Sequence, residues 1–175
     1  MRMHHLLALL MIFLVMNGAA DGYDDTKTHP DLTENSISFS KLDEYLRSNL
    51  GLTIGTDTPY NGKPIVELFR SGSTNEDKPL TRSRNHFWNS LNNKGLDDWP
   101  YAGDPNRDWA MGLIEANEYS WEDAREAYYA ALTSTTEWER EEHFIRMYEC
   151  LGRVLHLIED MGVPVRAGES ACWQL

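Results

Sequence analysis

The sequence has little cysteine and little positive charge, and each shortage argues against a class of protein. Only two cysteines occur among 175 residues, Cys150 and Cys172, too few for a disulfide framework; they can pair or remain independent thiols. The sequence has 16 lysines and arginines and 28 aspartates and glutamates, which gives a formal net charge of −12. Such acidity argues against a stable nucleic-acid partner and against attraction to anionic lipid. It suits a secreted protein, and clustered acids suit a cation site.

Long apolar runs are also scarce, and the one that stands out lies at the N-terminus. A short basic start, MRMHH, precedes an apolar run from Leu6 to Met16 and small residues up to Ala20. The run is too short for a comfortable membrane span. The pattern predicts a signal peptide over residues 1–20, cleaved near Ala20 or Gly22. We therefore expect an exported protein without a transmembrane span after cleavage; an uncleaved anchor is the alternative.

Strand alternation and internal repeats are lacking, whereas helical patterns recur. The spacing of apolar residues predicts a helix from Pro30 to Gly51 and a short helix that begins at Pro64. Two capping-box-like segments, Ser120–Asp123 and Ser134–Glu137, are expected to start two further helices. Trp109, Leu113 and Ala116 are expected on one helical face. The length suits one domain, and we predict an all-α multi-helix bundle.

Periodicity is lost between Ser71 and Asn106. This region is rich in glycine, proline, asparagine and aspartate but carries several tryptophans and tyrosines. A loop of this length inside a compact domain is more often functional when aromatic residues can anchor it. We predict a long ordered loop, with disorder as the alternative.

The stretch from Leu151 to Pro164, LGRVLHLIEDMGVP, carries the first chemical signal. An apolar stripe made of Phe144, Tyr148, Leu151, Leu155 and Ile158 predicts a long helix. His156 and Asp160 lie one turn apart beside this stripe, about 40° around the helix axis. An imidazole and a carboxylate so placed can bind one metal ion from a rigid support. A half-exposed histidine beside a solvated acid is the alternative. Gly152, one turn earlier, would let another helix pack closely.

Other candidate ligands are scattered along the chain. His29 lies at the start of the first helix, and His86 lies in the long loop nine residues after Asp77. Nitrogen and oxygen donors of this kind are ligands that zinc accepts. By the helical repeat, His143 points nearly opposite to His156 and is expected to be solvated.

Three segments carry a family resemblance: THPDLT at 28–33, STNEDKPLTRSRNHFWN at 73–89 and LGRVLHLIEDMGVP at 151–164. In this order they resemble the bacterial zinc-dependent phospholipase C family, whose fold is related to single-strand nucleases of the S1/P1 type. The resemblance implies an all-helical domain over residues 23–164 that holds up to three zinc ions. It also implies hydrolysis of a phospholipid head-group phosphodiester.

The resemblance assigns a role to each candidate ligand. Asp77, His86, His156 and Asp160 match the ligands of one zinc ion. His29 matches a ligand of a second ion that also shares Asp160 and, in the phospholipases, the mature N-terminal residue, for which Tyr23 is the candidate. The general base in the family corresponds to Asp77, which is therefore both ligand and candidate catalytic residue. The neighbouring acids Glu76 and Glu159 are available to orient ligand imidazoles, but we expect them to be solvated surface acids.

The resemblance ends after Pro164. The third zinc site of the family requires a histidine near this point, where the chain has Val165 and Arg166, and a charged arginine cannot bind a metal. The tail at 165–175 then diverges, which indicates a frameshift or truncation; a naturally divergent short form is the alternative. We expect at most two zinc sites, and we expect the hydrolase activity of this chain to be weak or lost.

Two other functions are compatible with the sequence. An S1/P1-type nuclease is the alternative enzyme, although the Trp-Gly start and nearby Gly-His usual in those nucleases are missing. A non-catalytic secreted binding module would instead use the aromatic residues of the 87–109 region as a contact surface.

Overall fold

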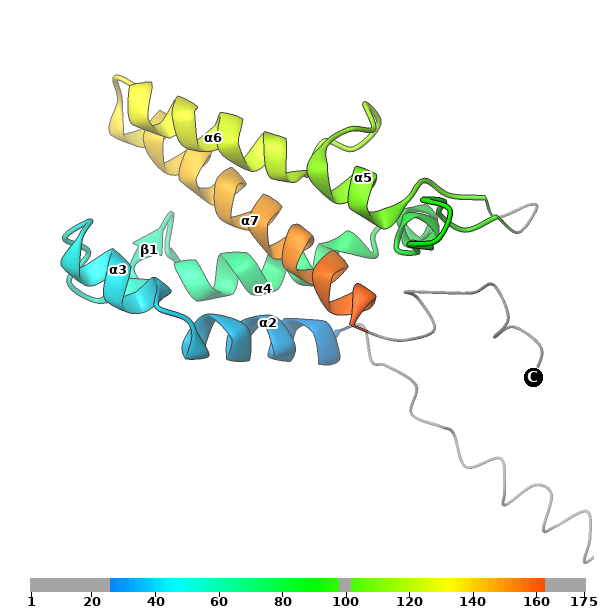
Figure 1. The fold of residues 1–175 in the computed structure, drawn as a ribbon. Coiled ribbons are helices and arrows are strands. Elements are labelled where there is room, and N and C mark those ends of the chain that lie inside the picture. Colours follow the sequence, from blue (N-terminus) through cyan, green and yellow to red (C-terminus); the bar gives the residue numbers. More distant parts are fainter. Residues whose placement is uncertain (1–25, 98–101, 163–175) are drawn as a thin grey trace, which may run out of the picture.

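The long C-terminal helix is the element against which the other helices pack. In the computed structural model, which describes residues 26–97 and 102–162, the chain is mostly helical (Figure 1). Helix α7 (Glu137–Met161) packs against α4 (Ile65–Glu76) and α6 (Trp121–Thr133), and α2 (Thr28–Phe39) lies along α4. The predicted all-α class is confirmed for these residues. The shorter elements are α3 (Leu42–Ser48), η1 (Gly55–Asp57), β1 (Pro59–Tyr60), β2 (Lys63–Pro64), η2 (Leu80–Asn85) and α5 (Asn106–Met111).

Local capping determines where α6 and α7 begin. The Ser120 side chain accepts a hydrogen bond from the Asp123 backbone N–H, and the Asp123 carboxylate accepts one from the Ser120 backbone N–H, so the predicted capping box of α6 is confirmed. For α7 the predicted start at Ser134 is wrong by two residues. The side chain of Thr136 accepts from the Glu139 backbone N–H instead.

The predicted helix from Pro30 to Gly51 is two helices. The backbone becomes extended at Ser40, where the Ser40 hydroxyl oxygen accepts a hydrogen bond from the Leu42 N–H, and α3 begins there. The break leaves the Phe39 side chain 88% exposed, whereas Leu46 is buried. The single apolar face that the predicted helix from Pro30 to Gly51 would have had therefore does not form.

A small hairpin, which was not predicted, connects η1 to α4. Strands β1 and β2 pair antiparallel, with Tyr60 opposite Lys63. Asn61 and Gly62 between them have φ values of 47° and 78°. Both residues thus adopt the left-handed conformation that a two-residue hairpin turn requires. An Asn-Gly pair is itself a turn signal in the sequence, but two-residue strands are too short to show alternation.

Two other boundaries differ from the prediction. Helix α4 continues through Ser71 to Glu76, so the long loop begins later than expected. Helix α5 ends at Gly112, whose φ of 83° makes it a left-handed cap. Leu113 is consequently 69% exposed, and the face expected to join it to Trp109 does not form.

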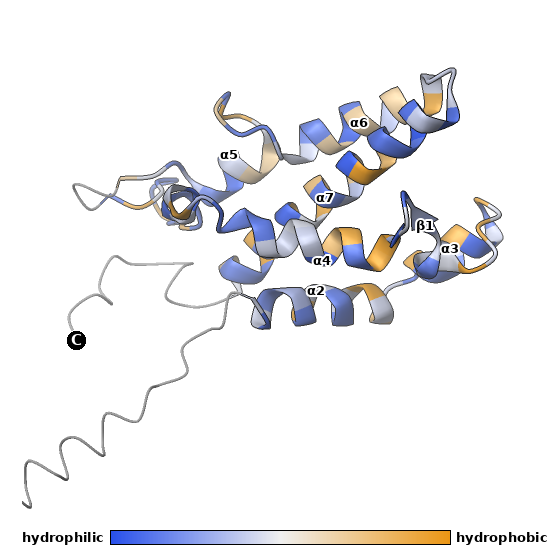
Figure 2. Ribbon diagram, turned by 180° about the vertical axis from the view of Figure 1, so that it is seen from behind, coloured by the Kyte–Doolittle hydropathy of each residue, from blue (hydrophilic) through white to orange (hydrophobic). Residues whose placement is uncertain are grey.

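The larger of two apolar clusters and the buried polar groups of α4 lie at opposite ends of this helix. Ile65, Leu68 and Phe69 of α4 pack against Tyr148 near the hairpin, and this half of α4 is hydrophobic in Figure 2. The other half carries polar residues, two of which, Ser73 and Glu76, are fully buried. Buried polar groups must find partners, so this end of the molecule is where a functional site is expected.

Two glycines let α4 and α7 approach backbone to backbone. A Cβ on Gly152 would lie 2.1 Å from the carbonyl oxygen of Phe69, and a Cβ on Gly72 would lie 2.2 Å from that of Glu149. Neither oxygen can move without displacing a helix. The predicted close packing at Gly152 is confirmed.

Replacing Gly152 by alanine is therefore expected to destabilise the protein by about 1–3 kcal/mol through overpacking, although alanine favours helix by about 1 kcal/mol. Urea unfolding measures the difference. Gly162→Ala is the control, because the one described atom that a Cβ there would meet is the Glu159 carbonyl oxygen at 3.1 Å. Equal stability of both variants would contradict the close contact.

Some predictions concern residues outside the described ranges: the signal peptide at 1–20, Tyr23 as a mature N-terminus, and the tail at 165–175 with Cys172. Within the described ranges, no helix combines the length and the apolar character that crossing a membrane would require.

Cys150 is a buried free thiol, and burial raises its pKa to about 11, which makes it unreactive at neutral pH.

Candidate metal centre

The five predicted ligands come together at the polar end of the bundle. His29 lies in the first turn of α2, Asp77 follows α4, His86 follows η2, and His156 and Asp160 lie on the last turns of α7. They form two groups, His29–His156–Asp160 and Asp77–His86–His156, in which the donor atoms lie within 4.8 Å of one another. His143 belongs to neither group.

Burial distinguishes this cluster from surface acids and histidines. His86 and His156 have no exposed surface, His29 is 3% exposed and Asp160 is 1% exposed. The alternative of a half-exposed His156 beside a solvated acid is therefore wrong. The Asp77 side chain, 18% exposed, is the one member of the five with appreciable contact with solvent.

Donor atoms of four residues lie close together in the cluster. His86 Nδ1 lies 2.7 Å from Asp160 Oδ2 and 3.6 Å from Asp77 Oδ1. His156 Nε2 lies 3.4 Å from Asp160 Oδ2 and 3.7 Å from Asp77 Oδ2. Ligands bound tetrahedrally to zinc at 2.0–2.1 Å are about 3.3 Å apart. The four spacings scatter around this value, so these side chains are close to the arrangement that a tetrahedral ion requires.

The second group is built on the other oxygen of Asp160. His29 Nε2 lies 3.4 Å from Asp160 Oδ1, and the rings of His29 and His156 stack with centroids 3.8 Å apart. One carboxylate thus faces two possible ion positions. His156 Nε2 can bind only one ion, so His29 and Asp160 are the donors left for the second position within the described ranges.

The tautomer of His156 is determined by the backbone of α4. His156 Nδ1 lies 2.9 Å from the carbonyl oxygen of Ser73, and because a carbonyl only accepts, Nδ1 carries the proton. This leaves a lone pair on Nε2, which is buried and has no hydrogen-bond partner among the described residues. A buried acceptor without a partner is costly, and a metal ion would satisfy it.

Buried carboxylates alter the protonation of His86. Burial opposes a charge on the ring, but the Asp160 and Glu76 carboxylates outweigh it and raise the pKa of His86 above its ordinary value. A cation is therefore stabilised at this position. Metal binding would replace the proton, since a histidine ligand must be neutral.

The prediction that Glu76 and Glu159 are solvated surface acids is wrong. Glu76 is fully buried, and its Oε1 lies 3.8 Å from His86 Nε2. The Glu159 side chain is 12% exposed, and its Oε2 lies 2.9 Å from His29 Nδ1. Each carboxylate thus faces the ring nitrogen that points away from the ion position, as carboxylates behind metal-bound histidines do.

Glu76 is the centre of a buried ionic network. Its carboxylate accepts hydrogen bonds from Arg82 Nη2 at 2.8 and 2.9 Å, from Arg153 Nη1 at 3.2 Å and from Trp109 Nε1 at 2.9 Å. Burial opposes ionisation, but the contact with His86 and the positive charge of Arg82 hold the pKa of Glu76 below its ordinary value. The network links α4, η2, α5 and α7 directly behind the cluster.

Sequence reasoning missed the residues that support the cluster. Asn106 is fully buried, and its amide donates to the carbonyl oxygens of His86 and Leu157, which attaches the end of the long loop to α7. One sequence feature could have indicated the buried network: Arg153 is a charged residue between Gly152, where close packing was expected, and the apolar Val154. The proposed aromatic contact surface also loses a member, because Trp109 is only 4% exposed.

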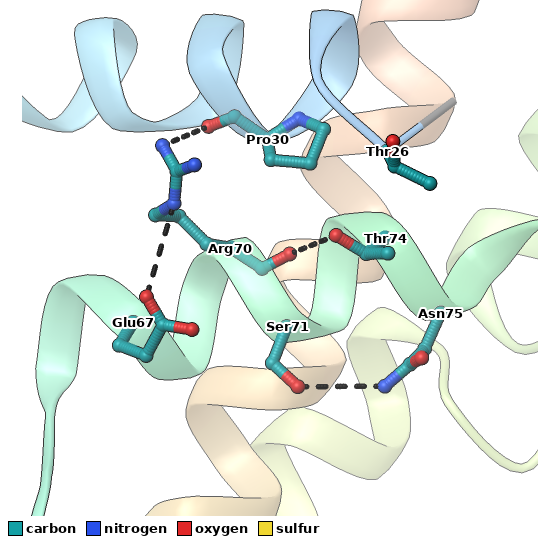
Figure 3. Close-up of a pocket in the computed structure, with 7 residues that line it drawn as sticks. All are labelled: Thr26, Pro30, Glu67, Arg70, Ser71, Thr74 and Asn75. Atoms are coloured by element: carbon teal, nitrogen blue, oxygen red, sulfur yellow. Dashed lines mark hydrogen bonds and ion pairs between the residues drawn. The ribbon is translucent and has the colours of Figure 1, made fainter. Parts of the chain in front are cut away.

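A separate pocket lies between α2 and α4 (Figure 3). Its two charged groups, Arg70 and Glu67, contact each other, and Arg70 also contacts Asp31, Glu34 and the Pro30 carbonyl. The Thr74 and Asn75 side chains donate within α4. With its polar groups engaged in these bonds, the pocket offers less for recognition than the cluster of histidines and aspartates.

Comparison of the chain with protein-family models, curated proteins and solved structures found no match.

Proposed function

We propose that the cluster binds zinc and that the protein is a zinc-dependent phosphodiester hydrolase of the phospholipase C type. The observation that carries the proposal is the convergence of Asp77, His86, His156 and Asp160 at spacings close to those of metal ligands, with the lone pair of His156 Nε2 directed into the cluster. These donors come from two distant parts of the chain. Two imidazoles and two carboxylates suit zinc better than magnesium or calcium, which prefer oxygen ligands alone.

The burial of the cluster suggests a division of roles among its members. A bound zinc ion would lower the pKa of a water ligand and stabilise charge on phosphate oxygens. The buried His86, His156 and Asp160 would hold the ion and exclude water from its inner side. Asp77, at the solvent edge, is placed to accept a proton from an attacking water molecule, which is the general-base role. The resemblance of residues 28–33, 73–89 and 151–164 to zinc-dependent phospholipases C supplies the substrate class, a phospholipid head-group phosphodiester.

Zinc is expected to bind the metal-free protein and to raise its thermal stability. At a free zinc concentration 100 times the dissociation constant the stabilisation is about 2.7 kcal/mol, and a chelator should reverse it. Differential scanning calorimetry measures the shift, and elemental analysis measures the metal content. Magnesium at the same concentration is the control. Absence of zinc after equilibration with excess metal would contradict the proposal.

The reaction class is tested with three substrates on the zinc-loaded protein. A phosphatidylcholine analogue, single-stranded DNA and a small aryl phosphodiester distinguish the phospholipase, the S1/P1-type nuclease and a hydrolase without head-group preference. We expect chelator-sensitive cleavage of the phosphatidylcholine analogue. Cleavage of DNA alone would favour the nuclease, and zinc binding without any cleavage would favour a non-catalytic module.

A further inference from the structure

His29 is held from both sides by two consecutive residues of α7. Its Nδ1 lies 2.9 Å from Glu159 Oε2, and its Nε2 lies 3.4 Å from Asp160 Oδ1. Since a carboxylate accepts, Nδ1 carries the proton and donates to Glu159. The lone pair of Nε2 is thereby directed towards Asp160, where the second ion position lies.

Glu159 is itself fixed by α2. The Thr33 hydroxyl donates to Glu159 Oε1 at 2.9 Å, and Thr33 is fully buried. Thr33 follows His29 by four residues and so lies on the same face of the helix. The carboxylate of Glu159 therefore bridges two side chains of α2, and both of its oxygens are engaged in defined hydrogen bonds.

The three imidazoles are oriented by different means. The backbone carbonyl oxygen of Ser73 accepts the hydrogen bond that orients His156, so no replacement of a side chain other than His156 itself removes that bond. His86 is enclosed on one side by Glu76 and on the other by Asp77 and Asp160. The hydrogen bond at His29 Nδ1 comes from a side chain, Glu159, which a single replacement removes. His29 is also the histidine assigned to the second ion alone.

We infer that Glu159 is a positioning residue that orients His29 and so determines whether the second ion position fills. This inference rests on the proposed zinc binding. It predicts a selective effect: loss of Glu159 weakens binding of the second ion and leaves the ion between Asp77, His86, His156 and Asp160 in place. Loss of a carboxylate behind a metal-bound histidine typically costs 10–100-fold in metal affinity.

A graded set of variants tests the inference. Glu159→Ala removes both the hydrogen bond and the charge and is expected to weaken the second ion 10–100-fold. Glu159→Gln keeps an acceptor for His29 Nδ1 and should have a smaller effect, as should Thr33→Val, which removes only the hydroxyl that fixes Glu159. Glu142→Ala, an exposed position on the same helix, controls for lost charge. The measurement is zinc bound per chain over a series of buffered free-zinc concentrations.

A second measurement is independent of metal. Nitrogen NMR of the imidazoles in the metal-free protein reports which nitrogen of His29 carries the proton. We expect Nδ1–H in the wild type and in Glu142→Ala, and a mixture of tautomers in Glu159→Ala. Circular dichroism of each variant establishes that it is folded, and Glu159→Gln and Thr33→Val provide milder changes should the alanine variant unfold.

The outcomes separate this inference from the proposed function. A wild-type protein that binds no zinc overturns both. A wild-type protein that binds a single ion, or one whose second ion and His29 tautomer are unchanged in Glu159→Ala, overturns the role of Glu159 and leaves zinc binding standing. Selective loss of the second ion, graded from alanine to glutamine, supports it.

Discussion

Replacing Glu76 by alanine is expected to lower the free energy of unfolding of the metal-free protein by about 3–5 kcal/mol, the usual cost of removing one partner from a buried ion pair. The guanidinium groups of Arg82 and Arg153, whose side chains are 12% and 10% exposed, would lose their shared carboxylate. Trp109 would lose the acceptor of its indole N–H. Chemical denaturation followed by circular dichroism measures the effect.

A matched control lies on the same helix. Glu67 has a 56% exposed side chain and contacts Arg70 at 3.8 Å, so Glu67→Ala is expected to change stability by less than about 0.5 kcal/mol. If Glu76→Ala cost no more than Glu67→Ala, the buried network would not contribute to the fold. Because Glu76 also lies behind His86, the variant that does fold should bind zinc more weakly than the wild type.

Asp160→Asn is expected to remove zinc binding at both positions. Asp160 faces one ion position with Oδ1 and the other with Oδ2, and an amide presents one neutral oxygen in place of two charged ones. We expect the affinity to fall by roughly 100-fold or more, since loss of a residue that only supports a ligand already costs 10–100-fold. Calorimetric titration with zinc measures the affinity, and the zinc-dependent gain in thermal stability should disappear with it.

Asp108→Asn is the control for this substitution. Asp108 lies on α5, its side chain is 19% exposed, and it pairs with Arg107 rather than with a histidine. The chemical change is the same, but zinc binding should be unaffected. Zinc affinity equal to that of the wild type in Asp160→Asn would show that metal binds elsewhere in the protein.

The two predictions describe one structural principle. Charged groups are buried at the end of α7 in two layers: an ionic network around Glu76, and in front of it the histidines and aspartates of the candidate metal centre. The first layer is balanced within the protein by two arginines. The second contains ligand-type donors, including the nitrogen of His156 that the described residues leave without a partner. We propose that a cation completes this second layer.

Features that depend on near neighbours in the chain could be predicted from the sequence. The capping box of α6 involves Ser120 and Asp123, three residues apart, and the Asn61–Gly62 turn is a property of two residues. The spacing of His156 and Asp160 follows from the helical repeat alone. Gly152 likewise indicated close packing, because the lack of a side chain is a property of the residue itself.

Features that depend on distant partners required the tertiary structure. Glu76 and Glu159 resemble solvated acids in the sequence because the groups that stabilise them are far away: His29 precedes Glu159 by 130 residues, and Arg153 follows Glu76 by 77. The exposure of Phe39 and Leu113 could not be predicted from the sequence either, because it depends on where the helices before these residues end. Local spacing thus determined the helices and the ligand types. Only folding decided which charges are buried, because the cost of burying a charge depends on the partners that packing brings to it.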